Sequence, residues 1–386
     1  MTEHNEKVQL SEEEQKALME KYDAESRTRK LSGMMSKVII GLLVVFSLFQ
    51  IYTGAFGELT AYIQRTVHLG FALVLIFLLF PARKTALRQK IAWYDYILAV
   101  LAIIVCGYWP VFYDSLVQKI GSIDTAQMII GGLAIILVLE AARRVVGLPL
   151  VVIAIAFLLY ALYGPSMPGM LAHRGLSLEQ LINSMFYTTE GILGTPLQVS
   201  STFIFLFILF GAFLGQTGVG NYFNDLAISI AGRRIGGPAK VAVFTSALEG
   251  TISGSSVANV VQSGSYTIPL MKRLGYHRNF AGAVEAAAST GGQIMPPVMG
   301  AAAFLMVEFA GVPYIEIVKA AVIPAILYFT GIWIMVHFEA KKQGLRGLPK
   351  EEIPAKKEVF KKIYLLTPIL AIIIFMDIGT SISRAA

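Results

Sequence analysis

A polar stretch between two hydrophobic segments holds the residues of this chain that are best suited to bind an ion. Residues 250–276 read GTISGSSVANVVQSGSYTIPLMKRLGY, and SGSS at 253–256 lies near the middle of segment 238–272. A helix that breaks there leaves carbonyl oxygens unpaired at one half-helix end and N–H groups unpaired at the other. Carbonyl and hydroxyl oxygens suit a hard cation such as Na⁺, whereas N–H groups at a positive helix end suit a carboxylate. The predicted Na⁺ ligands of this stretch are Ser253, Gly254, Ser255 and Ser256.

A second stretch carries similar signals. Residues 285–304 read EAAASTGGQIMPPVMGAAAF, in which hydroxyls and glycines precede the pair Pro296–Pro297. Proline lacks an N–H donor and clashes with the preceding turn, so we expect the helix to open there. Two broken, hydroxyl-rich elements in one membrane chain are the pattern of a transporter's binding site.

Helix packing is the alternative interpretation of the same glycines. Gly250 and Gly254 have GxxxG spacing, as do Gly211 and Gly215, and small residues often mark close helix–helix contacts. Either stretch alone fits packing as well as binding. The two together favour a binding site.

Two acidic residues lie inside these elements, Glu249 in the first and Glu285 in the second. Carboxylates within a membrane are usually functional or paired. Each has either a proton-coupling role or a packing role. Glu140 is different, because it adjoins Arg143 and Arg144 and is expected to form an interfacial ion pair.

The composition predicts an all-α polytopic membrane protein. Of 386 residues, 55% are hydrophobic and 15% are charged, against roughly 25% charged in soluble domains. The net charge of +7 is attributed to basic residues on the cytosolic side rather than to nucleic-acid binding.

The single cysteine, Cys106, excludes a disulfide framework within the chain and is expected to pack in a span. About nine spans are predicted, near 34–56, 62–81, 93–112, 125–146, 148–164, 196–217, 279–310, 314–338 and 361–380.

The length of segment 238–272 predicts a re-entrant hairpin. Between Lys240 and Lys272 lie 31 residues, too few for two crossings with a turn, which need roughly 40, and more than the roughly 20 of one crossing. With a cytosolic N-terminus and a hairpin here, 27 of the 32 Lys and Arg residues fall on the cytosolic side. A full crossing would move eleven of them outside, so the positive-inside bias favours the hairpin.

The motifs of several other classes are missing or incomplete. GRRIGGPAK at 232–240 has Pro238 where a phosphate loop has its lysine. Ser253 or Ser255 would need a partnered histidine to act as a protease nucleophile, and only His68 falls near the centre of a span. A channel needs a symmetric filter, whereas one hairpin is present. We therefore predict no enzyme, no catalytic residue and no cofactor.

The motifs in full resemble a known family of transporters. SALEGTISGSSVANVVQSGSYTIPLMKRLGY followed by AGAVEAAASTGGQIMPPVMGAAAF resembles the large membrane subunit of the tripartite ATP-independent periplasmic (TRAP) transporters. YTTEGILGTPLQVSSTFIFLFILFGAFL at 187–214 is similar to the TAXI branch. The spans within 34–146 are similar in layout to the small membrane subunit, here fused upstream.

This resemblance implies secondary uptake of an organic acid, delivered by a periplasmic substrate-binding protein and coupled to Na⁺, with H⁺ as the alternative. It implies an elevator-type permease in the bacterial inner membrane, in contact with lipid. The motif match assigns the hairpin tip to Gly254, Ser255 and Ser256, and the broken helix near the sodium site to Thr290, Gly291 and Gly292. The implied substrate neighbours are Ser256, Asn259, Gln293 and Pro296.

The predicted division is a cytosolic amphipathic segment at 1–33, a small-subunit-like scaffold at 34–146 and the first half of the large subunit at 147–386. The last part holds the hairpin 238–272 and the broken helix 279–310. The family has two inverted halves, and only the first is visible here. We expect an incomplete chain, or one that pairs with a chain carrying the second half. The alternative is a non-transporting fragment that serves as a scaffold and binds partners.

Overall fold

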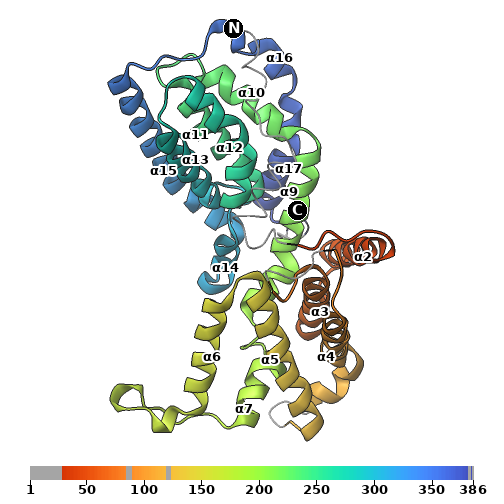
Figure 1. Ribbon diagram of the computed structural model, residues 1–386. Coiled ribbons are helices and arrows are strands. Elements are labelled where there is room, and N and C mark those ends of the chain that lie inside the picture. The colour runs from red at the N-terminus through yellow and green to blue at the C-terminus, as the bar shows by residue number, and fades with distance from the viewer. Residues whose placement is uncertain (1–27, 84–88, 119–122, 381–383, 385–386) are drawn as a thin grey trace. The chain divides into compact units, whose positions relative to one another are not determined.

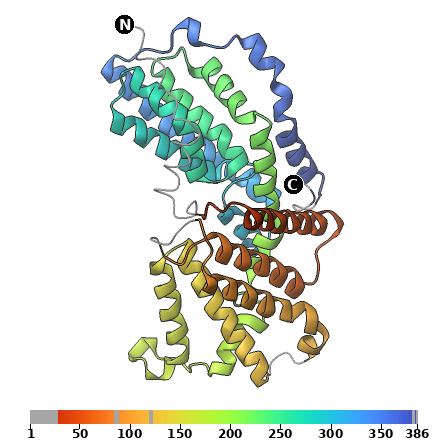
Figure 2. The ribbon, with the colours of Figure 1, turned by 45° about the vertical axis from the view of Figure 1, so that its right-hand side comes forward.

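The structure is a computed structural model that describes residues 28–83, 89–118, 123–380 and 384. Its regular elements in these ranges are helices and helical turns, without a strand (Figures 1 and 2). The predicted all-α class is confirmed. The amphipathic helix predicted within 1–33 lies outside the described residues, apart from the short stretch just before α2.

The chain divides into two compact units, with the boundary between Thr202 and Phe203. A π-helical turn, Ser200–Ile204, includes this boundary. In its described residues, the first unit contains a further π-helical turn, at Asn183–Tyr187, and two short 3-10 turns. Its α-helices are α2 (Met34–Phe56), α3 (Ala61–Leu79), α4 (Trp93–Gln118), α5 (Thr125–Val145), α6 (Leu148–Leu162), α7 (Leu178–Ile182) and α8 (Thr195–Val199).

Aromatic packing against α3 and α4 forms the core of the first unit. The Trp109 ring stacks on Tyr62 with centroids 4.1 Å apart, and its Nε1 donates a hydrogen bond of 3.3 Å to the carbonyl oxygen of Phe186. Gly70 of α3 lies directly against the Cβ of Cys106, which is buried and unbridged. The cysteine occupies the packing position expected for it.

The second unit contains the hairpin and the broken helix. Its α-helices are α9 (Phe205–Gln216), α10 (Val219–Ala231), α11 (Gly237–Ser253), α12 (Ser256–Arg273), α13 (Arg278–Gly291), α14 (Ala301–Ala310), α15 (Tyr314–Gln343), α16 (Lys356–Lys361) and α17 (Thr367–Asp377). Three 3-10 turns connect them: η5 (Gly292–Ile294), η6 (Lys350–Glu352) and η7 (Ile363–Leu366).

Small side chains let α11, α13 and α15 pack closely (Figure 1). Their shared core is rich in fully buried alanines, including Ala242 of α11, Ala288 of α13 and Ala340 of α15. Small residues at such contacts allow helix backbones to approach one another. The three helices therefore share one closely packed core.

Within the described residues, six helical runs are long and apolar enough to cross a membrane, and a bent pair at Lys350–Lys361 and Ile363–Asp377 would make seven. The six are Met34–Phe56, Ala61–Leu79, Trp93–Gln118, Thr125–Val145, Thr195–Gln216 and Tyr314–Gln343. Leu148–Leu162 and Ala301–Ala310 are apolar but shorter. The predicted span 279–310 is not among the six, because the helix break divides it into α13 and α14. The count of nine stays a prediction, as does the functional division at 146/147.

Candidate functional site

The hairpin turns within two residues. α11 ends at Ser253, Gly254 has φ 57°, and Ser255 is the N-cap of α12. A left-handed residue at this point favours glycine, because it has no Cβ. The Ser255 hydroxyl accepts a hydrogen bond of 3.3 Å from the backbone N–H of Ala258, which satisfies one of the free donors of α12. The local sequence therefore dictates both the end of α11 and the start of α12.

The second break is longer. α13 ends at Gly291, and the backbone is non-helical from Met295 to Gly300, the N-cap of α14. The peptide bond between the two prolines of this segment is cis. The N–H of Gly300 donates a hydrogen bond of 2.7 Å to the carbonyl oxygen of Gln293, which closes the segment into a loop. Met299 has φ 55°, which is uncommon for a residue with a side chain.

The two breaks meet, and we call this the tip contact: Gly254 against Met299 and Gly300. A Cβ on Gly254 would collide with the carbonyl oxygen of Met299, and one on Gly300 would lie 3.4 Å from the carbonyl oxygen of Gly254. A side-chain bond adds to this contact, since Gln293 Nε2 donates to the Ser256 hydroxyl at 3.1 Å. The turn between α11 and α12 and the loop before α14 are therefore in contact, although they are distant in the sequence.

Glycine is also required one turn before the tip. A Cβ on Gly250 would collide with the Cα of Gly292, whereas Gly215 has open space around its Cα. The packing interpretation of the GxxxG spacing therefore holds for Gly250. It does not exclude the binding interpretation, because the same close approach brings the two breaks together.

The hydroxyls of the tip bond to nearby side-chain amides and backbone N–H groups. Ser253 Oγ donates to Asn259 Oδ1 at 2.5 Å and accepts from the backbone N–H of Ser255 at 3.2 Å. The Asn259 side chain lies beside Gly292 and is fully buried. Ser253, Gly254, Ser255 and Ser256 therefore form one cluster with Asn259, Gly292 and Gln293.

The remaining predicted residues are placed differently. The Thr290 side chain is exposed, and its hydroxyl donates to the carbonyl oxygen of Ala286 on its own helix at 2.7 Å. Gly291 faces the rings of Tyr328 and Phe329. Pro296 is half-buried in the loop between η5 and α14. Residues 253–256 thus connect to Gly292 through the Asn259 side chain. The Thr290 hydroxyl takes no part in this cluster, because it bonds to its own helix.

Oxygen atoms are the donor set that this region offers to a cation. Within the described ranges, no group of three or more His, Cys, Asp and Glu side chains is arranged to hold a metal ion. The tip contact presents the carbonyl oxygens of Met299 and Gly254 and nearby serine hydroxyls. Such neutral oxygens fit a monovalent hard cation better than a transition metal.

Buried polar atoms without a hydrogen-bond partner gather in the hairpin. Of the eight such side-chain atoms in the described residues, four belong to α11 and α12: Thr245 Oγ1, both carboxyl oxygens of Glu249 and Asn259 Nδ2. Buried polar groups are rarely left unpaired, so each calls for a ligand, an ion or a proton. Asn259 Nδ2 is a donor and suits a carboxylate oxygen.

Glu285 is surrounded by hydroxyl groups that the sequence interpretation did not assign. Four side chains donate to its carboxylate: Ser246, Ser263, Thr267 and Ser289. Two of them show a signal in the sequence. Ser263 and Thr267 are four residues apart on α12, which places both on one helix face. Their common partner on α13 is visible only in the folded bundle.

A lysine near the start of α11 is also buried. Lys240 Nζ lies 3.0 Å from Nδ1 of His337 and 5.2 Å from the centroid of the Trp333 ring. This contact joins α11 to α15 and involves none of the tip residues.

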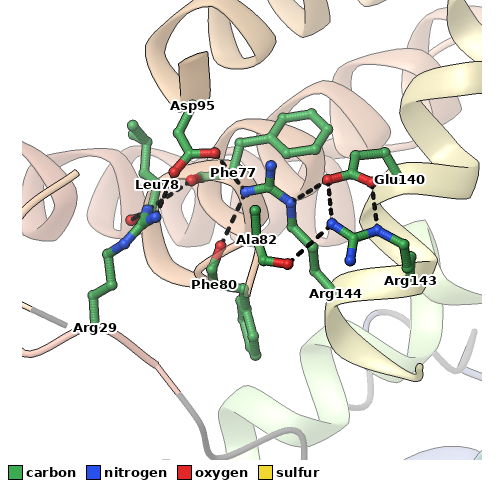
Figure 3. A network of polar contacts seen from close by, with 9 residues as sticks. All are labelled: Arg29, Phe77, Leu78, Phe80, Ala82, Asp95, Glu140, Arg143 and Arg144. Carbon is green, nitrogen blue, oxygen red and sulfur yellow. Dashed lines mark hydrogen bonds and ion pairs between the residues drawn. The ribbon is translucent and has the colours of Figure 1, made fainter. Parts of the chain in front are cut away.

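The first unit contains a separate arginine network, formed by Arg29, Asp95, Glu140, Arg143 and Arg144 (Figure 3). The predicted pairing of Glu140 is observed, at 2.7 Å to Arg143 and 2.8 Å to Arg144. Asp95 and Arg29 were missed, because they lie far from Glu140 in the sequence.

The arginine network also caps the end of α3. Arg29 donates to the carbonyl oxygens of Phe77 and Leu78, and Arg144 donates to that of Phe80 (Figure 3). Cations are favourable at the carbonyl end of a helix. The network therefore supports the fold of the first unit.

A histidine in the first unit also contacts a serine. His68 Nε2 lies 3.1 Å from Ser200 Oγ, but its Nδ1 lies 2.6 Å from the amide nitrogen of Gln50. A nucleophilic serine needs a base that a third group orients, and a carboxylate usually serves. Here an amide occupies that position. Together with Gln64, which donates to the carbonyl oxygen of Ser201 at 2.9 Å, the pair ties α2 and α3 to the π-turn after α8.

Residues 133–386 match the family described as "Tripartite ATP-independent periplasmic transporter, DctM component". The match includes residues 203–386 of the second unit and starts within α5. It contains both breaks and every residue of the tip contact.

Curated proteins similar to this chain carry related names. The sialic acid TRAP transporter large permease protein SiaM of Vibrio cholerae is 29% identical over 170 residues, covering 43% of this chain and 39% of that protein. The C4-dicarboxylate TRAP transporter large permease protein DctM of Vibrio cholerae is 26% identical over 235 residues, covering 59% and 46%.

The isethionate TRAP transporter permease protein DctMQ of Oleidesulfovibrio alaskensis is 32% identical over 143 residues, covering 36% of this chain and 22% of that protein. The chain thus spans less than half the length of these curated relatives.

Proposed function

Because the chain belongs to the DctM component family of TRAP transporters, we propose that it is the membrane permease component of an ion-coupled uptake system for organic acids. The named relatives concern sialic acid, C4-dicarboxylates and isethionate, which are all organic acids. The six candidate membrane spans of the described residues agree with a permease. Its place is the bacterial inner membrane, with the N-terminus in the cytosol.

The tip contact is the observation that carries this proposal. α12 begins at Ser256 and α14 at Ala301, so two helix N-termini adjoin the contact between Gly254 and Gly300. The same contact adjoins the C-terminus of α11. Positive helix ends attract a carboxylate, and negative ends with free carbonyl oxygens attract a cation.

Na⁺ is the proposed coupling ion. Its proposed ligands are oxygens of residues 253–256 and of the backbone near 290–292. The contact of Gly292 with Gly250 and Asn259, one turn from the tip, supports this choice. The proposed substrate neighbours are Ser256, Asn259, Gln293 and Pro296. Asn259 supports this assignment best, because its Nδ2 is a buried donor without an acceptor.

The remaining components of the system follow from the same proposal. A periplasmic substrate-binding protein delivers the acid, and lipid surrounds the spans. Residues 34–146, most of which precede the family match, serve as a fused, small-subunit-like scaffold, as in the TAXI branch. An elevator movement, with 147–386 as the first of two inverted halves, is part of the proposal. Because the matches cover under half of the relatives, transport is proposed for an assembly that includes the second half, on the same or another chain.

Uptake into proteoliposomes tests the proposal. The complete permease, with its binding protein outside, should accumulate radiolabelled acid under an inward Na⁺ gradient. Gly254→Val should abolish uptake, because a Cβ at this position meets the Met299 carbonyl oxygen. Ser255→Ala should weaken uptake and raise the Na⁺ concentration required.

Gly215→Ala is the matched control, because nothing lies within 4 Å of the added methyl group. It should transport like the unmodified permease. Sodium-dependent uptake that Gly254→Val and Ser255→Ala leave intact would remove the site assignment. No uptake by any assembly would favour the scaffold alternative.

A further inference from the structure

The second unit buries two carboxyl groups close together, Glu249 on α11 and Glu285 on α13, which we call the carboxylate pair. Both side chains are at least nine-tenths buried, with residue exposures of 3% and 0%. Their surroundings differ.

Hydroxyl groups from three helices point at Glu285. Its Oε1 accepts from Ser263 at 2.5 Å, from Ser289 at 2.9 Å and from Ser246 at 3.1 Å. Thr267 donates to its Oε2. An ionised carboxylate has only acceptor sites, and several donors around it stabilise the charged form. Gly264 leaves room for this side chain, since a Cβ there would lie 3.0 Å from Glu285 Cγ.

Glu249 lies three residues after Ser246 on α11, hence on the same helix face. Among the described residues, neither of its carboxyl oxygens accepts a hydrogen bond of normal geometry, although the Ser263 hydroxyl that donates to Glu285 lies close by. The charged group that acts on it is Glu285 of α13, and the neighbouring polar group is Ser263 of α12. Four further elements pack against α11, namely α9, α10, α15 and η5. Their described residues place no charged side chain that acts on Glu249.

Two buried carboxylates without a cation cannot both be ionised at low cost. Removing a charge from water is expensive, and like charges at close range repel, so such a pair holds a proton. The donors decide which member holds it. We infer that Glu249 is a proton-binding site and carries this proton, while Glu285 is the ionised member that the four hydroxyls hold in place.

The protonation state of Glu249 affects the packing of α11 against the second break. Glu249 directly precedes Gly250, whose Cα packs against Gly292 in the second break. Ionisation of Glu249 would demand water or a cation beside it, and the close contact of α11 with α13 would have to open. The proton therefore holds the two breaks together. The proton site depends only on the described bundle, and its effect on uptake rests on the proposed function.

Infrared spectroscopy of the purified full chain in lipid nanodiscs tests the inference without an uptake assay. At neutral pH, the unmodified chain should show the C=O stretch of one protonated carboxylic acid in a buried setting, shifted in D₂O. Glu249→Gln should abolish this band. Glu285→Gln should keep the band at neutral pH. When the pH is raised, the band should be lost at a lower pH than in the unmodified chain, because the neighbouring negative charge that favours the proton is gone.

Glu316→Gln is the matched control, since Glu316 is an exposed carboxylate on α15, and it should leave the band unchanged. Absence of the band in the unmodified chain, or its survival in Glu249→Gln, would overturn the inference. Loss of the band on addition of NaCl at constant pH would also overturn it, because the pair would then be a cation site.

Thermal melting gives a second readout that needs no band assignment. If the folded chain holds an extra proton on Glu249, its melting temperature should fall as the pH rises, because the unfolded chain releases that proton. Glu249→Gln copies the neutral form, so it should fold and flatten this dependence. An unchanged slope in a folded Glu249→Gln variant would contradict the inference.

Discussion

Buried charge is arranged differently in the two units. In the arginine network of the first unit, Asp95 lies between Arg29 and Arg144, and the side chains of all three are at most 1% exposed. Opposite charges and helix-end carbonyl oxygens compensate nearly every polar atom, Arg29 Nε being an exception. In the second unit, the carboxylate pair has hydroxyl donors on one side and none on the other.

This difference separates a structural network from a site. A buried ion pair that is complete keeps one geometry, and removal of one member leaves a costly uncompensated charge. A buried acid without a partner can instead exchange a proton or ligand. The comparison teaches that the number of polar residues is less informative than which of their atoms lack partners.

The largest expected effect lies in the first unit. Asp95→Asn leaves the guanidinium groups of Arg29 and Arg144 buried without this counter-charge, and we expect the free energy of unfolding to fall by about 3–5 kcal/mol. Chemical unfolding in detergent micelles, with yield from membranes as a second readout, measures it. Glu140→Gln should cost less, because the Glu140 side chain is 25% exposed. Equal stability of Asp95→Asn and the unmodified chain would contradict the structural role of the network.

A smaller effect is expected from the donors of the carboxylate pair. Thr267→Val removes the hydroxyl that donates to Glu285 while keeping the shape, and it should lower the free energy of unfolding by about 1.5–3 kcal/mol, as for hydrogen bonds to charged groups.

Ser265→Ala provides the control in the same helix, because this hydroxyl donates only to the carbonyl oxygen of Gln262, at 2.9 Å. Its unfolding curve should match that of the unmodified chain. If both variants behaved alike, Glu285 would not need its donors, and the contrast between the two carboxyl groups would lose its basis.

The smallest effect concerns the space beside Glu285. Gly264→Ala places a methyl group 3.0 Å from Glu285 Cγ, and we expect a loss of about 1 kcal/mol from overpacking. Gly282→Ala on α13 has open space and should gain about 0.5–1 kcal/mol from helix propensity. Melting temperatures of the two variants should therefore shift in opposite directions; shifts of the same sign would show that Gly264 makes no room for the carboxylate.

Local patterns predicted much of the fold. The long apolar runs predicted the six candidate spans, because a hydrophobic run of that length can be recognised from the local sequence alone. Gly254 and the prolines at 296 and 297 marked the places where helices end, since these residues act on their own backbone. The Glu140 ion pair was likewise predictable, because its partners are three and four residues away.

Contacts across helices could not be predicted in this way. The Thr290 hydroxyl was expected near the ion, yet it bonds to its own helix. The serine and threonine donors of Glu285 come from α11, α12 and α13, and no spacing in the sequence connects them to that residue. Asp95 and Arg29 were missed for the same reason.

By itself, the sequence determined the helical class, the hydrophobic segments and the two backbone breaks, because each depends on neighbours within a few residues. Only the tertiary structure decided that Gly254 meets Met299 and Gly300, and that hydroxyls surround Glu285 but not Glu249. Packing determines these contacts, since they depend on how close whole helices approach and which faces they turn to one another.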